Sequence, residues 1–171
     1  MKKLSQLLII TVLLSVLSPF VLAETKIAVI DLDRAVLMTK FAQQQQKKLT
    51  DNDEYKALVE KFQLLQKDLQ DLEKEANTKG MTWSNEQRAE HANKVKYKSS
   101  DYQLVGKKIE SQRNAAINVV KQQFGTVLKE VVNKIIEDEE ITLLLNAKAV
   151  YFAVPDLNIT QKVTTALDAK N

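Results

Sequence analysis

The fold is decided by residues 58–76, which read LVEKFQLLQKDLQDLEKEA. The apolar residues of this stretch recur in alternating steps of four and three. That spacing keeps a narrow stripe on one face of a helix, turned toward a partner helix. The stripe consists of Leu58, Phe62, Leu65, Leu69, Leu72 and Ala76. Because such a stripe forms a two-helix seam and not a globular core, the stretch predicts one limb of a coiled-coil hairpin.

A second striped segment follows a break at residues 80–84. Its apolar positions are Tyr102, Val105, Ile109, Ala116, Val120, Phe124, Val127, Val131 and Ile135. Gly80 suits the left-handed position that ends a helix, and Ser84 with Gln87 three residues later matches a capping box. We therefore predict a helical hairpin arm over residues 34–137, with its tip near 80–84 and its return helix starting at Asn85.

Several features should interrupt the two limbs. The glutamines at 43–46 and the polar cluster at 50–53 weaken the apolar stripe, so the outgoing helix is expected to bend or restart near Thr50. We interpret the glutamines as an exposed face. Gly106 and Gly125 lie inside the return helix, where a glycine costs about 1 kcal/mol relative to alanine. They are candidate hinges that let the arm widen, or else points of close packing against the facing limb.

Short apolar runs flank the arm and predict strands. Residues 25–31 are rich in β-branched side chains, and residues 141–145 and 149–154 look like a strand pair that stops at Pro155. A final amphipathic helix opens at Asn158 or Thr160. The expected fold class is α+β, with a small β body formed by residues 24–33 and 138–171 from which the arm projects.

Three short strands leave an unpaired edge and an exposed face. Closing strands from several copies into one barrel removes the edges, so we expect a cyclic oligomer. The spacing of the residues does not set the copy number.

The first residues carry an export signal. Lys2 and Lys3 precede an apolar run at 7–17, and small or branched residues lead up to Ala23. This pattern predicts a signal peptide over residues 1–23, cleaved after Ala23. The run has about 11 residues, fewer than the roughly 20 that cross a bilayer. The chain has no cysteine, so it folds without disulfides. The periplasm of a Gram-negative cell is the expected location.

Charge is distributed unevenly along the chain. The formal net charge of +3 falls to +1 without Lys2 and Lys3, because 23 basic and 22 acidic residues remain. Residues 79–108, however, hold seven basic and three acidic side chains, a local charge of +4. This surplus near the tip is either a chance feature of a solvated helix or an attraction for acidic partners. The near-zero total and the export signal argue against nucleic-acid binding.

The distal arm supplies the candidate contact residues. Met81 and Trp83 lie at the predicted tip, where they either contact a partner or hold the turn against Ala89 or Ala92. The full candidate set for client binding is Met81, Trp83, Arg88, Lys94, Lys96, Lys98, Lys107 and Lys108. His91 is the single histidine, and we interpret it as a surface residue. Without cysteine, a second histidine or a glycine-rich phosphate loop, we predict no catalytic residue, metal, cofactor or enzyme activity.

Three segments carry a family resemblance. They are KIAVIDL at 26–32, ITLLLNAKAVY at 141–151 and PDLNIT at 155–160. Together with the charged hairpin between them, they resemble the Skp (OmpH) family of periplasmic chaperones over the whole mature chain. The resemblance implies a homotrimer with one shared β-barrel body, whose three arms enclose a cavity for unfolded outer-membrane proteins. The basic cluster proposed to bind lipopolysaccharide in that family has only a local analogue here, so a transient contact with lipopolysaccharide or a membrane stays open.

Two functions fit these features. The first is an ATP-independent holdase that binds unfolded outer-membrane proteins and prevents their aggregation. The alternative is a structural coiled-coil adaptor or spacer in the cell envelope. A spacer should keep a clean seam and a polar exterior, whereas a holdase should carry apolar residues beside the seam. Val59, Leu64, Tyr97 and Val119 fall beside the main stripe. They favour the holdase unless they widen the stripe itself.

Overall fold

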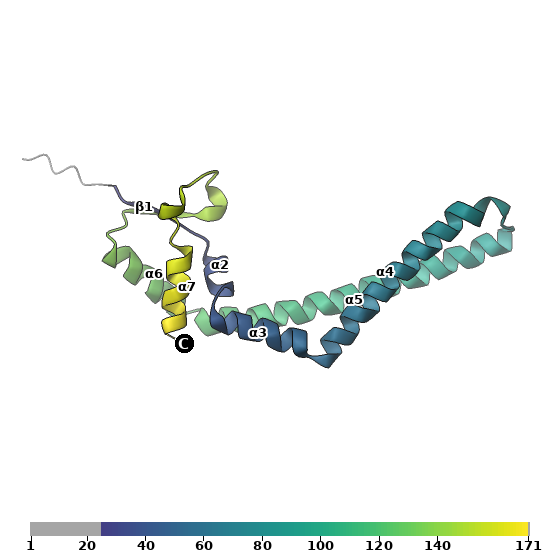
Figure 1. Ribbon diagram of the computed structural model, residues 1–171, viewed down its shortest axis with the longest axis horizontal. Helices are drawn as coiled ribbons and strands as arrows, with labels where there is room; N and C mark the ends of the chain where they lie inside the picture. Colours follow the sequence, from purple (N-terminus) through teal and green to yellow (C-terminus); the bar gives the residue numbers. More distant parts are fainter. Residues whose placement is uncertain (1–24, 171) are drawn as a thin grey trace, which may run out of the picture.

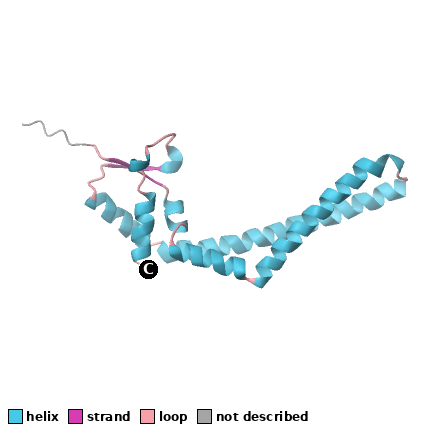
Figure 2. Cartoon of the chain, viewed as in Figure 1, coloured by secondary structure: helices cyan, strands magenta, loops and turns pink. Residues whose placement is uncertain are grey.

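The computed structural model describes residues 25–170, and Figures 1 and 2 show a mainly helical chain in which a long helix pair extends from a smaller cluster of elements. The signal peptide predicted over residues 1–23 lies outside the described residues. The strands are β1 (Ile27–Ile30) and β2 (Leu143–Asn146), and the α-helices are α2 (Leu32–Leu37), α3 (Lys40–Asp51), α4 (Asp53–Lys79), α5 (Asn85–Phe124), α6 (Val127–Asp138) and α7 (Thr160–Ala169).

Helices α4 and α5 run antiparallel beside each other, and with the turn between them they are called the arm below (Figure 1). The residues buried along their seam are Tyr55, Leu65, Val105 and Ile109. Phe62 stacks on Tyr102 across the seam, with ring centroids 4.2 Å apart. The capping box at the start of α5 is confirmed, because Ser84 and Gln87 each accept the other's backbone N–H.

The turn at the tip differs from the predicted one. Gly80 has φ −58°, in the right-handed region, and it opens the 3₁₀ turn η2 (Gly80–Thr82). The chain then reverses through Trp83, whose backbone is extended. Because these conformations suffice for the reversal, the left-handed glycine expected at Gly80 is wrong.

The outgoing limb is divided into three helices. The restart expected near Thr50 is confirmed, since α3 ends at Asp51 and α4 begins at Asp53. The chain bends between α3 and α4, and this bend is called the elbow below (Figure 1). The side chain of Asn52 accepts the N–H of Tyr55 at 2.9 Å and so caps α4 there. An earlier break was not expected: Thr39 caps α3, and α2 is a separate helix. The return limb also breaks, at Gly125 between α5 and α6.

The sheet has two parallel strands within residues 25–170. β1 pairs with β2 in the register Ile27 to Leu143, and Val29 also forms a bridge with Asn158. The strand predicted over 149–154 is wrong. The Asn146 side chain accepts the N–H of Lys148 at 2.9 Å and turns the chain into the 3₁₀ turn η3 (Ala147–Ala149). The following residues therefore leave the sheet and reach a second turn, η4 (Pro155–Leu157).

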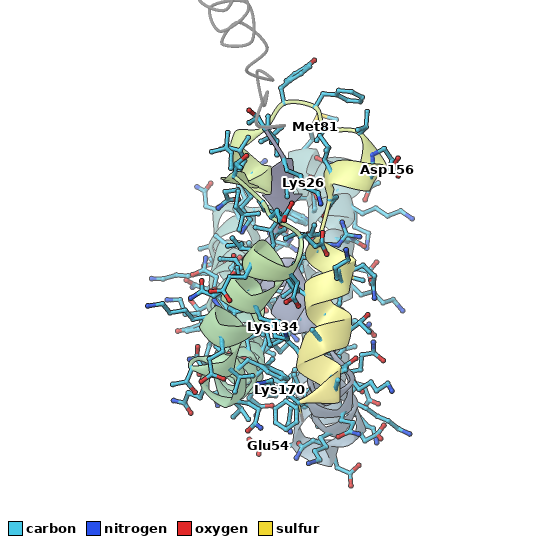
Figure 3. The ribbon with its side chains drawn as sticks, turned by 90° about the vertical axis from the view of Figure 1, so that its left-hand side faces the viewer. Lys26, Glu54, Met81, Lys134, Asp156 and Lys170 are labelled. Atoms are coloured by element: carbon cyan, nitrogen blue, oxygen red, sulfur yellow. The ribbon has the colours of Figure 1, made fainter. Side chains whose placement is uncertain are left out.

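Helices build most of the body, a name used here for β1, β2, α2, α6 and α7. Figure 3 views the molecule from this end, with Lys134 on α6 and Lys170 directly after the neighbouring α7. Its core joins the last turns of α5 to residues from every helix of the body; the members are Ala28, Ile30, Ala35, Val36, Ala42, Val120, Phe124, Val131, Ile135, Ile141, Ile159, Val163 and Leu167. Thr164 is also buried, and its hydroxyl donates to the carbonyl of Ala35 at 2.9 Å. This hydrogen bond ties α7 to α2.

Candidate functional site

The tip of the arm separates its two candidate apolar residues. Met81 is 92% exposed. Trp83 instead turns inward and packs on His91, with ring centroids 4.5 Å apart. His91 Nε2 lies 3.0 Å from the carbonyl oxygen of Leu72 on α4 and donates to it, because a carbonyl only accepts. His91 is therefore a link between α4 and α5 rather than the surface residue that was expected.

Two of the candidate lysines are paired within the arm. Lys94 Nζ lies 2.7 Å from Glu90 Oε1, and Lys98 Nζ lies 2.5 Å from Asp68 Oδ2 across the seam. The hydrogen bond and the charge of Glu90 raise the pKa of Lys94, and Lys94 in turn lowers the pKa of the Glu90 carboxyl. Both lysines thus carry a nearby counter-charge.

The other basic candidates point to solvent. Arg88, Lys96, Lys107 and Lys108 are exposed, and none of them forms an ion pair within residues 25–170. The positive surplus predicted for the distal arm therefore resides mainly in these four side chains. They are the residues most open to an acidic partner.

Large apolar side chains stand on the arm beside the seam. Leu64 is 60% exposed, Tyr97 71% and Leu104 53%. Tyr97 and Leu104 are seven residues apart and share a face of α5. Val119 is also exposed, whereas Val59 packs against the seam and widens it. Leu104 was not among the expected residues, although its spacing from Tyr97 was a signal for it.

The two glycines of the return limb have different surroundings. A Cβ added at Gly106 would lie 3.2 Å from Cε2 of Phe62, so the missing side chain makes room for that ring. At Gly125, between α5 and α6, an added Cβ would meet only backbone carbonyl oxygens, at 3.5 Å or more. Gly106 is therefore a point of close packing against the facing limb, whereas Gly125 lies at the junction of two helices.

Two cavities lie where the arm meets the body. One, of about 550 Å³, opens between α3 and α5. The other, of about 280 Å³, lies beside the α5–α6 junction, and Leu37 lines both. At the second cavity Asp33 accepts from Lys148 at 2.6 Å and lies 3.6 Å from Lys121. The hydrogen bond and charge of Lys148, with the charge of Lys121, lower the pKa of the Asp33 carboxyl.

The body also exposes an apolar segment after β2. The side chains of Tyr151, Phe152 and Val154 are exposed, as is that of Leu143 on β2 itself. Along residues 25–170 no group of three histidine, aspartate or glutamate side chains could hold a metal ion. No helix in that part of the chain has the length and apolar character needed to span a bilayer.

Comparison with known proteins places the chain in a family. The family described as Outer membrane protein (OmpH-like) matches residues 26–167, so the chain belongs to the OmpH-like family. The resemblance predicted from residues 26–32, 141–151 and 155–160 is thereby confirmed. The crystal structure of a candidate outer membrane chaperone (OmpH-like) from Caulobacter crescentus is 21% identical, with 85% of each chain covered and a TM-score of 0.47. No curated protein matches the chain.

Proposed function

We propose that the mature chain is an ATP-independent periplasmic holdase chaperone that binds unfolded outer-membrane proteins. Membership of the OmpH-like family supports a chaperone role. The observation that carries the proposal is the exposure of Leu64, Tyr97 and Leu104 on the arm, away from the seam. An unfolded client presents apolar side chains, and many weak contacts hold it while still permitting release. A coiled-coil spacer has no use for such residues.

Electrostatic attraction is the second part of the proposal. Arg88, Lys96, Lys107 and Lys108 give the distal arm a positive surface. Outer-membrane barrel clients tend to be acidic, and opposite charge speeds encounter at low ionic strength. Met81 adds an exposed apolar contact at the tip. We assign client binding to these five residues together with the apolar side chains beside the seam.

The proposed assembly is a homotrimer whose bodies share one β-barrel and whose arms surround the client. Its support is the outer edge of β2, which pairs with no further strand within residues 25–170, and the exposed Tyr151 and Phe152, which a neighbouring copy would cover. An open strand edge beside apolar side chains is otherwise a site of aggregation. Gly125, at the α5–α6 junction, is the proposed hinge of each arm.

The test is an aggregation assay without ATP. A urea-unfolded outer-membrane barrel protein is diluted into buffer with the purified mature chain, and turbidity is followed while light scattering gives the molar mass of the chain. We expect suppression by a trimer. The double variant Leu64→Ser, Leu104→Ser should suppress less, whereas its matched control Gln63→Ser, Gln103→Ser, at neighbouring exposed positions, should match the wild type.

Two further readings separate the parts of the proposal. Suppression that does not weaken with added salt would remove the electrostatic part. Emission of Trp83, the single tryptophan, reports on the tip, and an unchanged spectrum on adding client would argue against a client contact there, at the neighbouring Met81. A monomer that leaves turbidity unchanged would defeat both the assembly and the holdase function.

A further inference from the structure

The larger cavity, between α3 and α5 at the base of the arm, results from the kinds of side chain that α3 carries. At one end Phe41 packs edge-on against Phe124, with ring centroids 6.0 Å apart. At the other end Arg113 Nε donates to the hydroxyl of Tyr55 at 2.7 Å. Between these two clamps the α3 side chains that line the cavity are polar except for Ala42, where a continued stripe would have been apolar, and Ala116 opposite is small. A groove of about 550 Å³ remains, called the root groove below.

The lining of the root groove combines an apolar floor with amide groups. Leu37, Ile117 and Val120 supply aliphatic surface, and Gln43 and Gln46 stand on the α3 side. A glutamine amide offers one acceptor and two donors, the same kinds of group that an extended backbone exposes. Gln43 already donates through Nε2 to the carbonyl of Met38 at 3.1 Å, which leaves its Oε1 to accept from a backbone N–H of a bound segment. A peptide uses these amides, whereas an acyl chain leaves them unsatisfied.

The charge and the volume of the groove further restrict which kind of ligand can occupy it. Lys47 is the one charged residue among the groove's lining side chains, and it forms no ion pair in the described part of the chain. An acidic residue next to an apolar one therefore complements the groove. The volume lies within the roughly 300–1,000 Å³ of small-molecule sites. Leu37 also borders the 280 Å³ cavity, so a bound segment can continue past it toward the α5–α6 junction.

We propose that the root groove binds an extended, apolar segment of an unfolded polypeptide that carries an acidic residue. This inference rests on the proposed holdase function and adds to it a defined binding site for one segment of the client. The exposed side chains of the arm make diffuse contacts with a client, whereas the groove selects a short segment by backbone hydrogen bonding and by Lys47. It also accounts for two of the glutamines that interrupt the stripe of the outgoing limb, Gln43 and Gln46.

The test measures binding of a labelled peptide to the mature chain by fluorescence anisotropy. The probe is a synthetic peptide that alternates valine or tyrosine with serine or threonine and ends in two aspartates. Ala116→Trp fills the groove and should weaken binding about 10-fold, equivalent to about 1.4 kcal/mol. The matched control Ala115→Trp carries the same change on the neighbouring exposed residue and should bind as the wild type. Circular dichroism checks that both variants are folded.

A second pair of variants keeps the test valid if Ala116→Trp does not fold. Lys47 and Lys48 are adjacent and exposed on α3, but only Lys47 lines the groove. Lys47→Glu should weaken the acidic probe several-fold, and Lys48→Glu should have a clearly smaller effect because its charge lies farther from the bound segment. Equal weakening by Lys47→Glu and Lys48→Glu would indicate a general charge effect and would overturn the proposed binding of the peptide in the groove.

The remaining outcomes separate the groove from the holdase function. If the wild type suppresses aggregation while Ala116→Trp binds the peptide normally, the groove is wrong and the holdase stands. If the wild type binds the peptide through Ala116 but suppresses nothing, the groove stands as a peptide site and the holdase fails. A lower molar mass for Ala116→Trp would assign the groove to contact between copies. Binding of dodecanoate without binding of the peptide would assign it to an acyl chain. Contact between copies and binding of an acyl chain alone each overturn the proposal.

Discussion

The core of the body and the seam of the arm bury their apolar residues in different ways. In the body, strands and helices converge from several directions, and Val163 and Leu167 of α7 are completely buried. In the arm, two helices meet along a single stripe, so each buried residue has neighbours on one side only. Polar links supplement the seam: Arg113 to Tyr55, Lys98 to Asp68 and His91 to Leu72.

This difference assigns separate tasks to the two regions. A core enclosed on all sides resists local opening, because any opening exposes much apolar surface at once. A two-helix seam leaves both flanks of the arm in water, where apolar side chains such as Leu64 and Tyr97 stay accessible. The body is thus suited to anchor the chain, and the arm to present a surface.

The largest effect is expected from truncating the core of the body. Leu167 is 0% exposed, and Leu167→Ala should lower the free energy of unfolding by about 2–5 kcal/mol, because a cavity remains among α2, α6 and α7. Leu65→Ala in the seam should fall at the lower end of that range, since water reaches the vacated site. Urea unfolding followed by circular dichroism measures both. Leu64→Ala, at the adjacent exposed position, should stay within about 0.5 kcal/mol of the wild type. An equal loss for Leu65 and Leu167 would contradict the comparison.

A smaller effect is expected at the elbow between α3 and α4. Tyr55 is buried and its hydroxyl accepts from the Arg113 guanidinium. Tyr55→Phe should destabilise the chain by about 1 kcal/mol, because Arg113 is exposed and recovers water in exchange for the lost hydrogen bond. A double-mutant cycle with Arg113→Met, read by urea unfolding, isolates the pair. Additive losses in that cycle would show that the clamp contributes nothing of its own.

The two glycines should respond to different extents. Gly125 has right-handed helical backbone angles, and an added Cβ would make only ordinary van der Waals contacts with carbonyl oxygens, so Gly125→Ala should stabilise the chain by about 0.4–1 kcal/mol. Gly106→Ala gains similar helix propensity but crowds Phe62, and its net benefit should be smaller. Thermal unfolding compares the variants. Solution scattering shows whether Gly125→Ala also narrows the range of arm positions, and an unchanged range would argue against Gly125 as a hinge.

The sequence predicted the features that depend on neighbouring residues. The apolar stripe follows from helical spacing, the Ser84 capping box from two side chains three residues apart, and the elbow from the polar cluster at 50–53. Each of these has its cause within one or two helical turns. The same holds for the resemblance of the flanking segments, since it rests on the order of residues along the chain.

Features that join distant segments were missed or wrong. The parallel pairing of β1 with β2 joins residues more than 100 positions apart. The strand expected at 149–154 fails because Asn146 turns the chain after β2. The contact of His91 with Leu72 depends on how the two limbs align, which the spacing leaves undetermined. Close packing at Gly106 was predicted only as one of two alternatives, because the position of Phe62 opposite it depends on the same alignment. For the same reason the sequence named Lys94 and Lys98 without indicating that both are paired.

The smallest effect is expected at the boundary between the two regions, where Asp33 of α2 joins Lys148, in the turn η3 after β2, to Lys121 of α5. Because the pKa of Asp33 is lowered below its ordinary 3.8 and the pKa of Lys148 is raised above its ordinary 10.5, the pair stabilises the fold between these values. Its contribution disappears as the pH falls through the folded-state pKa of Asp33, and again as the pH rises through that of Lys148. The urea midpoint of Asp33→Asn should therefore lie slightly below that of the wild type at pH 7 and merge with it in strong acid. Asp71→Asn, at an exposed position on α4, is the control. A difference between Asp33→Asn and the wild type that persists unchanged in strong acid would mean that packing, and not charge, holds the arm to the body at this point.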